Sequence, residues 1–407
     1  MMMWDLIVLG GGAAGMAAAI SSSEQGERVL ILEKMDRVGK KILATGNGRC
    51  NLMNRILKPY PCGERFADQV FDRFPPESVA SFFRHLGLEL RTEGDGRVYP
   101  ASLQASSVLD VLRLKLVQLG VEILTEQKVD RLSRTDSLYT VRCGGNMYYG
   151  KRILLCTGGK AQEKLGSDGS GYRLAQGLGH SMIPVRPGLI PLVTEKEPIR
   201  GLEGIRVRCA ISVYDSGKTS HSESGEVLFT AYGLSGICVM NVSRYCQPGS
   251  RVLLNLGAGL QMSKEEIQTE LYRFSEERKQ FPSEMLLTGM FVRPLNRMLL
   301  VQSGIRPEKP IYELTHADLD RIADKICCYP VEVTGLKGFE QAQVTLGGLD
   351  PEEFDPKTME SRYASGLYAA GEILNVHGDC GGYNLMFAFA SGILAGLHGA
   401  RGCWEDN

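Results

Sequence analysis

The chain has 407 residues, of which 43% are hydrophobic and 23% are charged, and its formal net charge is -1. This length allows two or three domains with buried cores, and the near-zero charge gives no reason to expect nucleic acid as a partner. The 48 glycines exceed the ordinary share of about 7%. They gather in short clusters between apolar runs, as in turns that hold nucleotides.

The 11 cysteines are scattered, and no two have CxxC spacing. An odd number of cysteines in a long chain argues against a disulfide framework, so we expect a reducing, cytoplasmic setting and no metal site. The apolar start of the chain has no basic leading region and is interrupted by glycines at 10–12 and 15. We interpret it as a strand, a turn and a helix rather than a signal peptide. No run of about 18 apolar residues occurs, so we expect no membrane span.

The first residues predict a βαβ unit, with a strand at 6–9, a glycine turn at 10–15, a helix at 16–24 and a strand at 28–32. Short, continuous apolar strands are typical of a parallel sheet that is buried on both faces. A loop rich in glycine and lysine follows at 38–54. Beyond it we expect helices at 67–74, 77–86 and 107–119, a hairpin at 88–100, and strands at 121–125, 138–143 and 152–156.

The character of the sequence changes near Pro184. Three prolines and alternating strand-like stretches predict a mainly β insert, and residues 263–326 are charged with helical periodicity. Strand and turn signals return at about Val331 and lead into a glycine-rich strand-to-helix passage at 366–400. We therefore expect four parts: an N-terminal part at 1–185, a β-rich insert at 186–262, a small helical domain at 263–330, and a C-terminal part at 331–407 that completes the first.

The turn after the first strand has the pattern Gly10-x-Gly12-x-x-Gly15. In such a turn the first glycine permits the tight bend, the second lets the backbone approach a pyrophosphate, and the third lets helix and strand pack closely. The phosphates then lie at a helix N-terminus, where free N–H groups favour an anion. Glu33 ends the second strand 18 residues after Gly15 (33 − 15). Its carboxylate can accept both ribose hydroxyls, which favours FAD or NAD over NADP.

Two later stretches complete a split dinucleotide fold. Thr157-Gly158-Gly159 follows an apolar strand, and its small residues would let the chain cross beneath a dinucleotide, although any strand-ending turn can look the same. The stretch 366–372 ends a strand in Gly-Glu, whose backbone and carboxylate can reach the ribityl and pyrophosphate groups. The helix after Gly382 would direct its N–H groups at the flavin N1–C2=O edge, where negative charge builds on reduction. The motifs predict an α/β protein with a Rossmann-like FAD-binding domain of glutathione-reductase type, built from both chain ends.

Four strings then carry a specific resemblance: VGKKILATGNGRCN at 38–51, GSDGSG at 166–171, GEVLFT at 225–230 and GGYN at 381–384. They resemble the BaiN-like family of bacterial NAD(P)/FAD-dependent oxidoreductases, which is also described as the aminoacetone oxidase family. The resemblance runs from Asp5 to about Gly399. It implies an FAD domain from both chain ends, a β-barrel-like insert and a small helical part. It also implies that FAD is held by the first glycine turn, Glu33, the loop at 40–51 and the turns at Gly371 and Gly382.

The family's activities include NAD(P)H-linked reduction of a C=C bond in oxidised bile-acid steroids and oxidation of aminoacetone. The sequence departs from the family pattern at three positions. Asn375 and His377 stand where acids are common, and Ala231 stands where histidine is frequent. Any flavin contact or proton relay at these positions is in doubt here.

The loop at 40–51 suits FAD on physical grounds as well. Lys40 and Lys41 would place cations near a pyrophosphate, and Thr45, Gly46 and Gly48 would allow close backbone approach to the flavin; a solvated basic loop is the alternative. The full set of residues expected to contact FAD is Gly10, Gly12, Ala13, Ala14, Gly15, Glu33, Lys34, Lys40, Lys41, Thr45, Gly46, Gly48, Arg49, Cys50, Asn51, Val129, Thr157, Gly158, Gly159, Gly371, Glu372, Gly382, Tyr383, Asn384 and Leu385.

Four residues are candidates for the chemistry at the flavin. Cys50 could be a redox thiol, with a simply packed cysteine as the alternative. His377 could protonate a substrate, because its usual pKa suits acid–base work, with a loop histidine of no such role as the alternative. Tyr383 and Asn384 are our preferred hydrogen-bonding groups at the ring.

Arg97 and Tyr99 are expected to line the substrate side.

The leading hypothesis is an NAD(P)H-dependent FAD reductase that acts on an activated C=C bond of a small or steroid-like, bile-acid-type substrate. No second GxGxxG occurs, so NAD(P)H would visit the flavin transiently. The alternatives are an amine oxidase of aminoacetone type that uses O2 and, from another class, a flavin-holding accessory protein of RNA modification. The lack of a basic stripe speaks against the last. We expect a small-molecule substrate, no nucleic acid and no membrane, and the oligomeric state stays open.

Overall fold

A computed structural model describes residues 2–135, 138–215 and 218–398. The chain divides into two compact units. Unit 1 combines the described residues up to Pro187 with those from Ala342 on, and unit 2 is Gly188–Gln341. Gly399, where the family resemblance was expected to end, and the rest of the C-terminal part to residue 407 lie outside the described ranges.

Unit 1 is built on a seven-stranded sheet in the order β6-β2-β1-β9-β8-β7, with β18 also beside β9. The pairs β1–β2, β1–β9, β2–β6 and β9–β18 are parallel, whereas β7 and β8 extend the sheet as antiparallel strands. The central strands are continuous apolar runs because both faces of the sheet are covered. The strands are β1 (Met3–Leu9), β2 (Val29–Leu32), β6 (Glu122–Leu124), β7 (Arg131–Thr135), β8 (Leu138–Cys143), β9 (Asn146–Leu155) and β18 (Leu367–Ala369).

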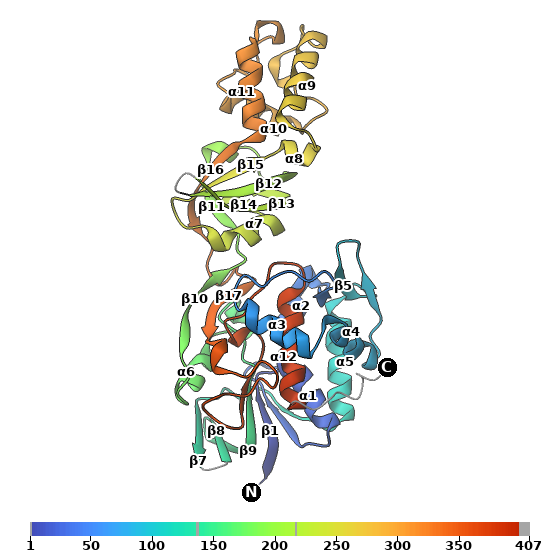
Figure 1. Ribbon diagram of the computed structural model, residues 1–407, viewed down its shortest axis with the longest axis vertical. Helices are drawn as coiled ribbons and strands as arrows, with labels where there is room; N and C mark the ends of the chain where they lie inside the picture. Colours follow the sequence, from blue (N-terminus) through green and yellow to red (C-terminus); the bar gives the residue numbers. More distant parts are fainter. Residues whose placement is uncertain (1, 136–137, 216–217, 399–407) are drawn as a thin grey trace. The chain divides into compact units, whose positions relative to one another are not determined.

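The helices of unit 1 come from both ends of the chain. They are α1 (Ala13–Glu24), α2 (Lys40–Ala44), α3 (Glu64–Arg73), α4 (Pro76–His85), α5 (Ala105–Gln118), α6 (Ser170–Gln176) and α12 (Tyr383–Leu397). Helices α1 and α12 lie side by side, in blue and red in Figure 1. Both are apolar nearly all round, which is the pattern of a fully buried helix.

Helices α1 and α12 touch through their backbones. A Cβ on Gly392 would lie 2.3 Å from the carbonyl oxygen of Ala14, and a Cβ on Gly396 would lie 2.4 Å from that of Ala18. Gly392 and Gly396 are four residues apart and so lie on one face of α12, and Ala14 and Ala18 lie on one face of α1 for the same reason. Small side chains on the two facing stripes are therefore what allows residues near position 15 and residues near position 392 to share one core.

Two small sheets flank the main one. The first has the order β3-β5-β4 and the second pairs β10 with β17. Their strands are β3 (Met53–Asn54), β4 (Leu90–Thr92), β5 (Arg97–Pro100), β10 (Met182–Gly188) and β17 (Val344–Leu349). The expected hairpin at 88–100 corresponds to β4 and β5.

Unit 2 contains a closed barrel in the order β11-β14-β13-β12-β15-β16. This finding confirms the expected barrel-like insert within a Rossmann-like α/β chain. The barrel strands are β11 (Leu192–Thr194), β12 (Arg206–Asp215), β13 (Lys218–Thr230), β14 (Gly233–Ser235), β15 (Arg251–Asn255) and β16 (Tyr329–Leu336). The expected start of the C-terminal part, at residue 331, falls inside β16, which pairs with β11 and β15 and so belongs to the barrel.

The helices of unit 2 share one hydrophobic core with the barrel. They are α7 (Ile237–Val242), α8 (Gly257–Leu260), α9 (Lys264–Glu277), α10 (Arg293–Gln302) and α11 (His316–Cys327). Capping boxes start α9 at Ser263 and α11 at Thr315, which explains why these two helices could be predicted from their sequence. Because Leu271 and Ile322 belong to the same buried cluster as the barrel's Ile211, the segment 263–330 is not a separate compact unit.

Within the described ranges, every helix is too short or too polar to cross a bilayer.

Candidate cofactor site

The glycine turn between β1 and α1 has one open side. A Cβ on Gly10 would lie 2.6 Å from the carbonyl oxygen of Cys156, and a Cβ on Gly15 would lie 2.0 Å from that of Gly10, so both glycines are required by packing. A Cβ on Gly12, in contrast, would meet no atom within 4 Å. Helix α1 begins directly after Gly12 without a side-chain cap. A pyrophosphate can therefore approach the first N–H groups of α1 from this side.

Glu33 is anchored on the same turn. Its Oε2 accepts the N–H of Gly11 at 2.8 Å, its Oε1 accepts the N–H of Met35 at 2.8 Å, and the residue is buried. Each carboxylate oxygen offers a second lone pair. The group is thus held in place and can still accept ribose hydroxyls.

Asp168 forms ion pairs with Lys34, the neighbour of Glu33, and with Lys128, and it was not among the residues expected to contact FAD. Its carboxylate lies 2.8 Å from the ammonium of Lys34 and 3.5 Å from that of Lys128, and it accepts the N–H of Ser170 at 2.9 Å. Burial raises the pKa of Asp168, but Lys34 and Ser170 outweigh burial and hold this pKa well below its ordinary value. The charge of Lys34 is therefore neutralised by Asp168. Val129, another residue expected to contact FAD, is half-buried and packs against the core of unit 1. The only sequence signal for Asp168 was its place in the GSDGSG string.

The two lysines of the loop at 40–51 lie on a short helix, α2, where the sequence suggested a loop. Lys40 pairs with Asp36 at 2.5 Å. Lys41 pairs with Glu372 at 2.7 Å and also donates to the carbonyl oxygen of Ala161 at 3.2 Å. We expected both lysines to place cations near a pyrophosphate, and in the structure each ammonium has a carboxylate partner. Lys41 instead joins the two ends of the chain.

The residues after α2 form a 3₁₀ turn, η1 (Thr45–Gly48), with an exposed backbone. Thr45 Oγ1 donates to the carbonyl oxygen of Ile42 at 2.6 Å. Gly46 and Gly48 have φ values of +56° and +81°, a region that favours glycine. A Cβ on Gly48 would meet no atom within 4 Å, so this part of the loop is open to a flat ligand.

Cys50 and Asn51 follow at the end of the loop. Cys50 is fully buried, and burial raises the pKa of its thiol to about 11. A redox role for Cys50 is not supported, because the reactive thiolate is disfavoured. Asn51 is also buried, and its Oδ1 has no hydrogen-bond partner within the part of the chain that the structure describes. This oxygen lies beside the start of α12, because a Cβ on Gly382 would come within 2.8 Å of it.

Thr157, Gly158 and Gly159 cross beneath the first glycine turn. The carbonyl of Cys156 meets Gly10, and a Cβ on Gly159 would lie 2.3 Å from Thr345 Oγ1. Thr345 Oγ1 accepts the N–H groups of Lys160 and Ala161 at 2.7 and 3.0 Å. Contacts between chain segments therefore explain why these residues are small. Thr345, which no sequence pattern marked, binds the backbone directly after the crossing.

The C-terminal passage returns to the same place through a 3₁₀ turn, η8 (Gly371–Ile373). Gly371 has a φ of +75°, and its Cβ would lie 3.1 Å from the Cβ of Ala14. Glu372 accepts the N–H of Thr345 at 2.9 Å on Oε1 and pairs with Lys41 through Oε2. We expected this carboxylate to reach the ribityl and pyrophosphate groups, but both of its oxygens serve to fasten the loop at 40–51 to the C-terminal passage.

Helix α12 begins after Gly382, which has a φ of +101°, and it has no side-chain cap. Tyr383 Oη donates to the carbonyl oxygen of Ile56 at 2.8 Å. Asn384 accepts the N–H of Gly378 at 2.9 Å and donates to the carbonyl oxygens of Gly378 and Asp379. Both side chains hold neighbouring loops, so the groups left for a ligand at this helix start are its backbone N–H groups. The next residue, Leu385, packs against the core of unit 1.

The three departures from the family pattern have separate settings. Asn375 is buried, and its Oδ1 accepts the N–H of Gly347 at 3.0 Å and the thiol of Cys62 at 3.2 Å. His377 is buried, and its backbone N–H donates to the carbonyl oxygen of Cys62 at 3.3 Å. Ala231 lies in unit 2, in the turn between β13 and β14.

The arrangement fits a dinucleotide that carries a flavin. The uncapped α1 and the open side of Gly12 suit the pyrophosphate, and Glu33 suits a ribose. The uncapped α12 and the lone Oδ1 of Asn51 suit the polar edge of a flavin ring, which has both hydrogen-bond donors and acceptors.

Comparison with known proteins bears on this arrangement. Residues 4–398 match the model of a family described as HI0933-like protein Rossmann domain. The chain belongs to the HI0933-like family. Its members resemble the BaiN and aminoacetone oxidase flavoproteins, so the expected family is confirmed, and the chain is an FAD-dependent oxidoreductase with a Rossmann fold.

Three relatives span nearly the whole chain. The chain is 38% identical to the 3-dehydro-bile acid delta(4,6)-reductase of Clostridium scindens, over 97% of this chain and 98% of that protein. It is 29% identical to the ribosomal RNA dihydrouridine synthase of Escherichia coli, over 95% and 96% of the two chains. It is 27% identical to the protein of the same name from Haemophilus influenzae, over 97% and 98%.

Among solved structures, the chain is similar to the 3-ketosteroid-delta4-(5alpha)-dehydrogenase of Rhodococcus jostii RHA1. The identity is 15%, the TM-score is 0.49, and the match covers 98% of this chain and 97% of that one. A likeness at this level says nothing about activity.

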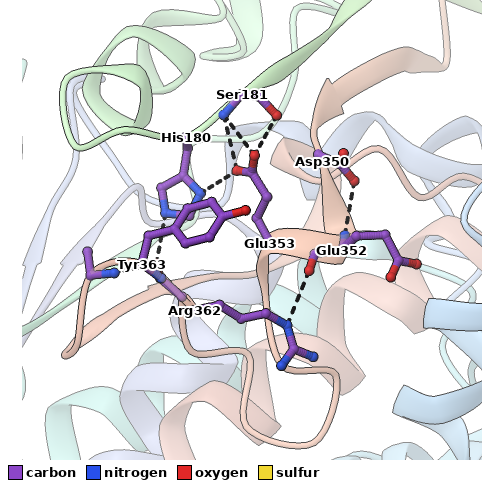
Figure 2. A network of polar contacts seen from close by, with 9 residues as sticks. His180, Ser181, Asp350, Glu352, Glu353, Arg362 and Tyr363 are labelled. Carbon is purple, nitrogen blue, oxygen red and sulfur yellow. Dashed lines mark hydrogen bonds and ion pairs between the residues drawn. The ribbon is translucent and has the colours of Figure 1, made fainter.

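A second cluster of buried polar groups lies outside these motifs, at the start of β10 (Figure 2). His180 Nδ1 is 2.7 Å from Glu353 Oε2, and His180 Nε2 is 2.9 Å from Ser361 Oγ. Serine hydrolases use the same order of contacts. Here, however, Ser361 is buried and its Oγ accepts the N–H groups of Tyr363 and Ala364 at 3.0 and 2.9 Å. Because Ser361 is buried and its Oγ already accepts two backbone N–H groups, no lone pair is left to attack a substrate.

The cluster therefore fastens segments of unit 1 together. Glu353 accepts the N–H of Ser181 at 3.1 Å and its hydroxyl at 2.5 Å (Figure 2), and the ring of His180 stacks on Phe354 with centroids 4.6 Å apart. Burial raises the pKa of Glu353, but the contacts with Ser181 and His180 outweigh burial and hold this pKa below its ordinary value.

Replacing the central carboxylate should weaken the fold in a pH-dependent way. We expect Glu353→Gln to lower the free energy of unfolding at pH 7 by about 2 kcal/mol, because hydrogen bonds to a buried charged group are lost. Since the folded-state pKa of Glu353 is depressed, its contribution is present above the unfolded value of about 4.5 and is lost as the pH falls through the folded-state pKa. Urea unfolding should show a smaller difference in the free energy of unfolding between the wild type and Glu353→Gln at pH 4 than at pH 7. Glu352→Gln, at the exposed neighbouring position, is the control; equal effects of both substitutions would contradict this role.

Proposed function

We propose that the protein uses FAD and NAD(P)H to reduce a C=C bond conjugated to a carbonyl group in a small or steroid-like substrate of bile-acid type. The observation that carries the proposal is the 38% identity, over nearly both full lengths, to a bile acid reductase. Bound FAD would supply a hydride from its N5 after taking one from the nicotinamide. The chain offers no second GxGxxG turn, so the nicotinamide would bind only for the transfer.

The residues of unit 1 would serve this reaction mainly through their backbone. The first N–H groups of α1 would bind the pyrophosphate, and Glu33 would hold the ribose of the adenosine. The first N–H groups of α12 would stabilise negative charge on the N1–C2=O edge of the ring, because they lie at the positive end of the helix dipole. Asn51 Oδ1 would gain the hydrogen-bond donor that the described residues do not give it.

A second candidate substrate is a uracil base in ribosomal RNA, and two relatives named as dihydrouridine synthases favour it. The chemistry would be the same, since C5=C6 of uracil is conjugated to a carbonyl group. The identities are lower, at 29% and 27%, and the formal net charge of -1 gives no general attraction to RNA. For these reasons we place the small-molecule substrate first.

Anaerobic stopped-flow measurements test the proposal. We expect NADH or NADPH to bleach the oxidised flavin spectrum of the purified protein. The reduced protein is then mixed in turn with a 3-oxo-Δ4 bile acid, an rRNA fragment that contains uridine, and O2. Fastest reoxidation by the bile acid is the expected result. No bleaching at millimolar donor would overturn the reductase proposal, and fastest reoxidation by O2 would favour the amine oxidase alternative.

A further inference from the structure

The hydroxyl of Tyr99, on β5, is arranged as a hydrogen-bond donor. Arg97 Nη1 donates to Tyr99 Oη at 3.3 Å. Arg97 is itself held by Asp95, through Nε at 2.7 Å, and by Glu93 at 3.5 Å. Because the guanidinium already occupies an acceptor position on the phenol oxygen, the Tyr99 proton is left to be donated. No acceptor for that proton occurs among the residues 2–135, 138–215 and 218–398.

Strand β5 places Tyr99 close to the start of α12. It pairs with β3 in the register Met53↔Val98 and Asn54↔Arg97. Strand β3 lies directly on the turn before α12, since Asn54 Nδ2 donates to the carbonyl oxygen of Gly381 at 3.1 Å. Val98 is fully buried, and side chains alternate along a strand, so Arg97 and Tyr99 share the opposite face, on which Arg97 is half-buried and Tyr99 is 6% exposed.

Arg49 adds an unpaired positive charge near the same hydroxyl. It is exposed and makes no hydrogen bond or ion pair with any residue that the structure describes. Lys40, Lys41 and Arg97, in contrast, all have carboxylate partners. Burial raises the pKa of Tyr99, and Glu93 and Asp95 raise it further. The charges of Arg97 and, to a smaller extent, Arg49 oppose that rise. In the chain, Arg49 directly follows η1 and stands two residues before Asn51, whose Oδ1 lies beside the start of α12.

Two exposed apolar side chains follow β3, and the first of them lies against Gly96, the residue before Arg97. Ile56 and Leu57 are 53% and 54% exposed. Ile56 is fixed by Tyr383, whose hydroxyl donates to its carbonyl oxygen at 2.8 Å, and a Cβ on Gly96 would lie 2.8 Å from its side chain. A ligand held at the hydroxyl of Tyr99 can thus rest an apolar body on Ile56 and Leu57, which suits a steroid-like ketone better than a base in RNA.

We propose that Tyr99 and Arg49 bind the carbonyl oxygen of the substrate and that Tyr99 is the proton donor of the reduction. This inference rests on the function proposed above. A hydride, which NAD(P)H supplies through bound FAD, forms a C–H bond at the β-carbon. The electrons of the C=C bond move toward the carbonyl oxygen, and that oxygen takes the Tyr99 proton to give an enol. The phenolate left on Tyr99 is stabilised by Arg97 and Arg49 and takes a proton from water, while the enol rearranges to the saturated ketone. Arg97 acts only through Tyr99 and is a positioning residue.

The test separates the two half-reactions of the FAD-loaded protein. In Tyr99→Phe we expect the reoxidation of dithionite-reduced protein by a 3-oxo-Δ4 cholenoic acid to slow about 100-fold, the usual size of effect for one donor at a developing oxyanion. FAD content and flavin reduction by NAD(P)H should stay at the wild-type level. Arg49→Gln and Arg97→Gln should slow the same step about 10-fold, as expected for weakened charge stabilisation. Tyr149→Phe and Arg65→Gln, at surface positions of β9 and α3, are the matched controls.

A binding measurement keeps the inference separate from the choice of electron donor. The keto acid should perturb the spectrum of the oxidised flavin, with its dissociation constant raised about 10-fold in Tyr99→Phe for the loss of one hydrogen bond. The same steroid without the 3-oxo group should bind both proteins equally. If NAD(P)H cannot bleach the flavin, the proposed function is wrong, but the expected difference in keto-acid binding between the wild type and Tyr99→Phe still stands. Wild-type rates in both Tyr99→Phe and Arg49→Gln, or a wild-type protein that does not bind the keto acid, would overturn the role of Tyr99.

Discussion

Gly12→Val should strongly weaken FAD binding without harming the fold of the FAD-free protein. The backbone of Gly12, with φ −85° and ψ −164°, is open to any residue, and its Cβ would meet no protein atom within 4 Å. The added side chain would instead occupy the side of the turn from which a pyrophosphate reaches α1. We expect a loss of affinity of about 100-fold or more, which corresponds to about 2.7 kcal/mol.

Two measurements on the same variant check this expectation. Flavin content of the purified protein and titration of the FAD-free protein with FAD report binding, and urea unfolding without FAD reports stability. Gly145→Val is the matched control, because a Cβ there also meets no atom within 4 Å and the residue lies in the turn between β8 and β9. Full flavin content in Gly12→Val would contradict the assigned pyrophosphate position, and loss of the FAD-free fold would contradict the open side of the turn.

Gly392→Val should have the opposite effect and destabilise the protein even without FAD. Its Cβ would lie 2.3 Å from the carbonyl oxygen of Ala14. A backbone atom cannot move aside as a flexible side chain can, so α1 and α12 would have to separate. We expect the free energy of unfolding to fall by about 3 kcal/mol or more, at the upper end for an overpacked core.

Urea unfolding of the FAD-free protein measures this effect, again with Gly145→Val as the control. If Gly392→Val and the wild type unfold at the same urea concentration, α1 and α12 do not pack through their backbones. Read together, Gly12→Val and Gly392→Val separate a glycine kept for a ligand from a glycine kept for the fold. In the sequence, Gly12 is marked by the pattern Gly10-x-Gly12-x-x-Gly15, whereas no motif marks Gly392.

The parts of the fold that local patterns specify could be predicted. The first βαβ unit follows from two apolar strands around the turn Gly10–Gly15, and the structure places β1, α1 and β2 there with their ends shifted by a few residues. The helices α9 and α11 could be predicted because each has its own capping box and helical periodicity. In these segments the local signal and the final structure agree.

Elements that depend on distant contacts could not be predicted. Helix α2 is five residues long, too short to be stable by itself, and its Lys41 is paired with Glu372, 331 positions later. Helix α7 lies in a region that reads as mainly β, because its apolar residues carry no helical cap or charge pattern. Short elements like these are fixed by tertiary packing rather than by propensity.

The same limit applies to side chains at the candidate site. The types of residue suggested that Lys40, Lys41 and Glu372 would be available to FAD, but sequence does not show which charges meet. In the structure the three are neutralised by one another or by Asp36. The glycine turn, the crossing and the two uncapped helix starts depend on backbone, and their contact with FAD stays a prediction.

The central claim is that the two ends of the chain hold one FAD between them, and hydrogen exchange on FAD-free protein with added FAD tests it most directly. The account predicts that amides of residues 10–16 and of residues 371–386 gain protection together, with the same dependence on FAD concentration, while those of α9 to α11 in unit 2 do not change. Protection confined to one end of the chain, or to neither end, would contradict the claim.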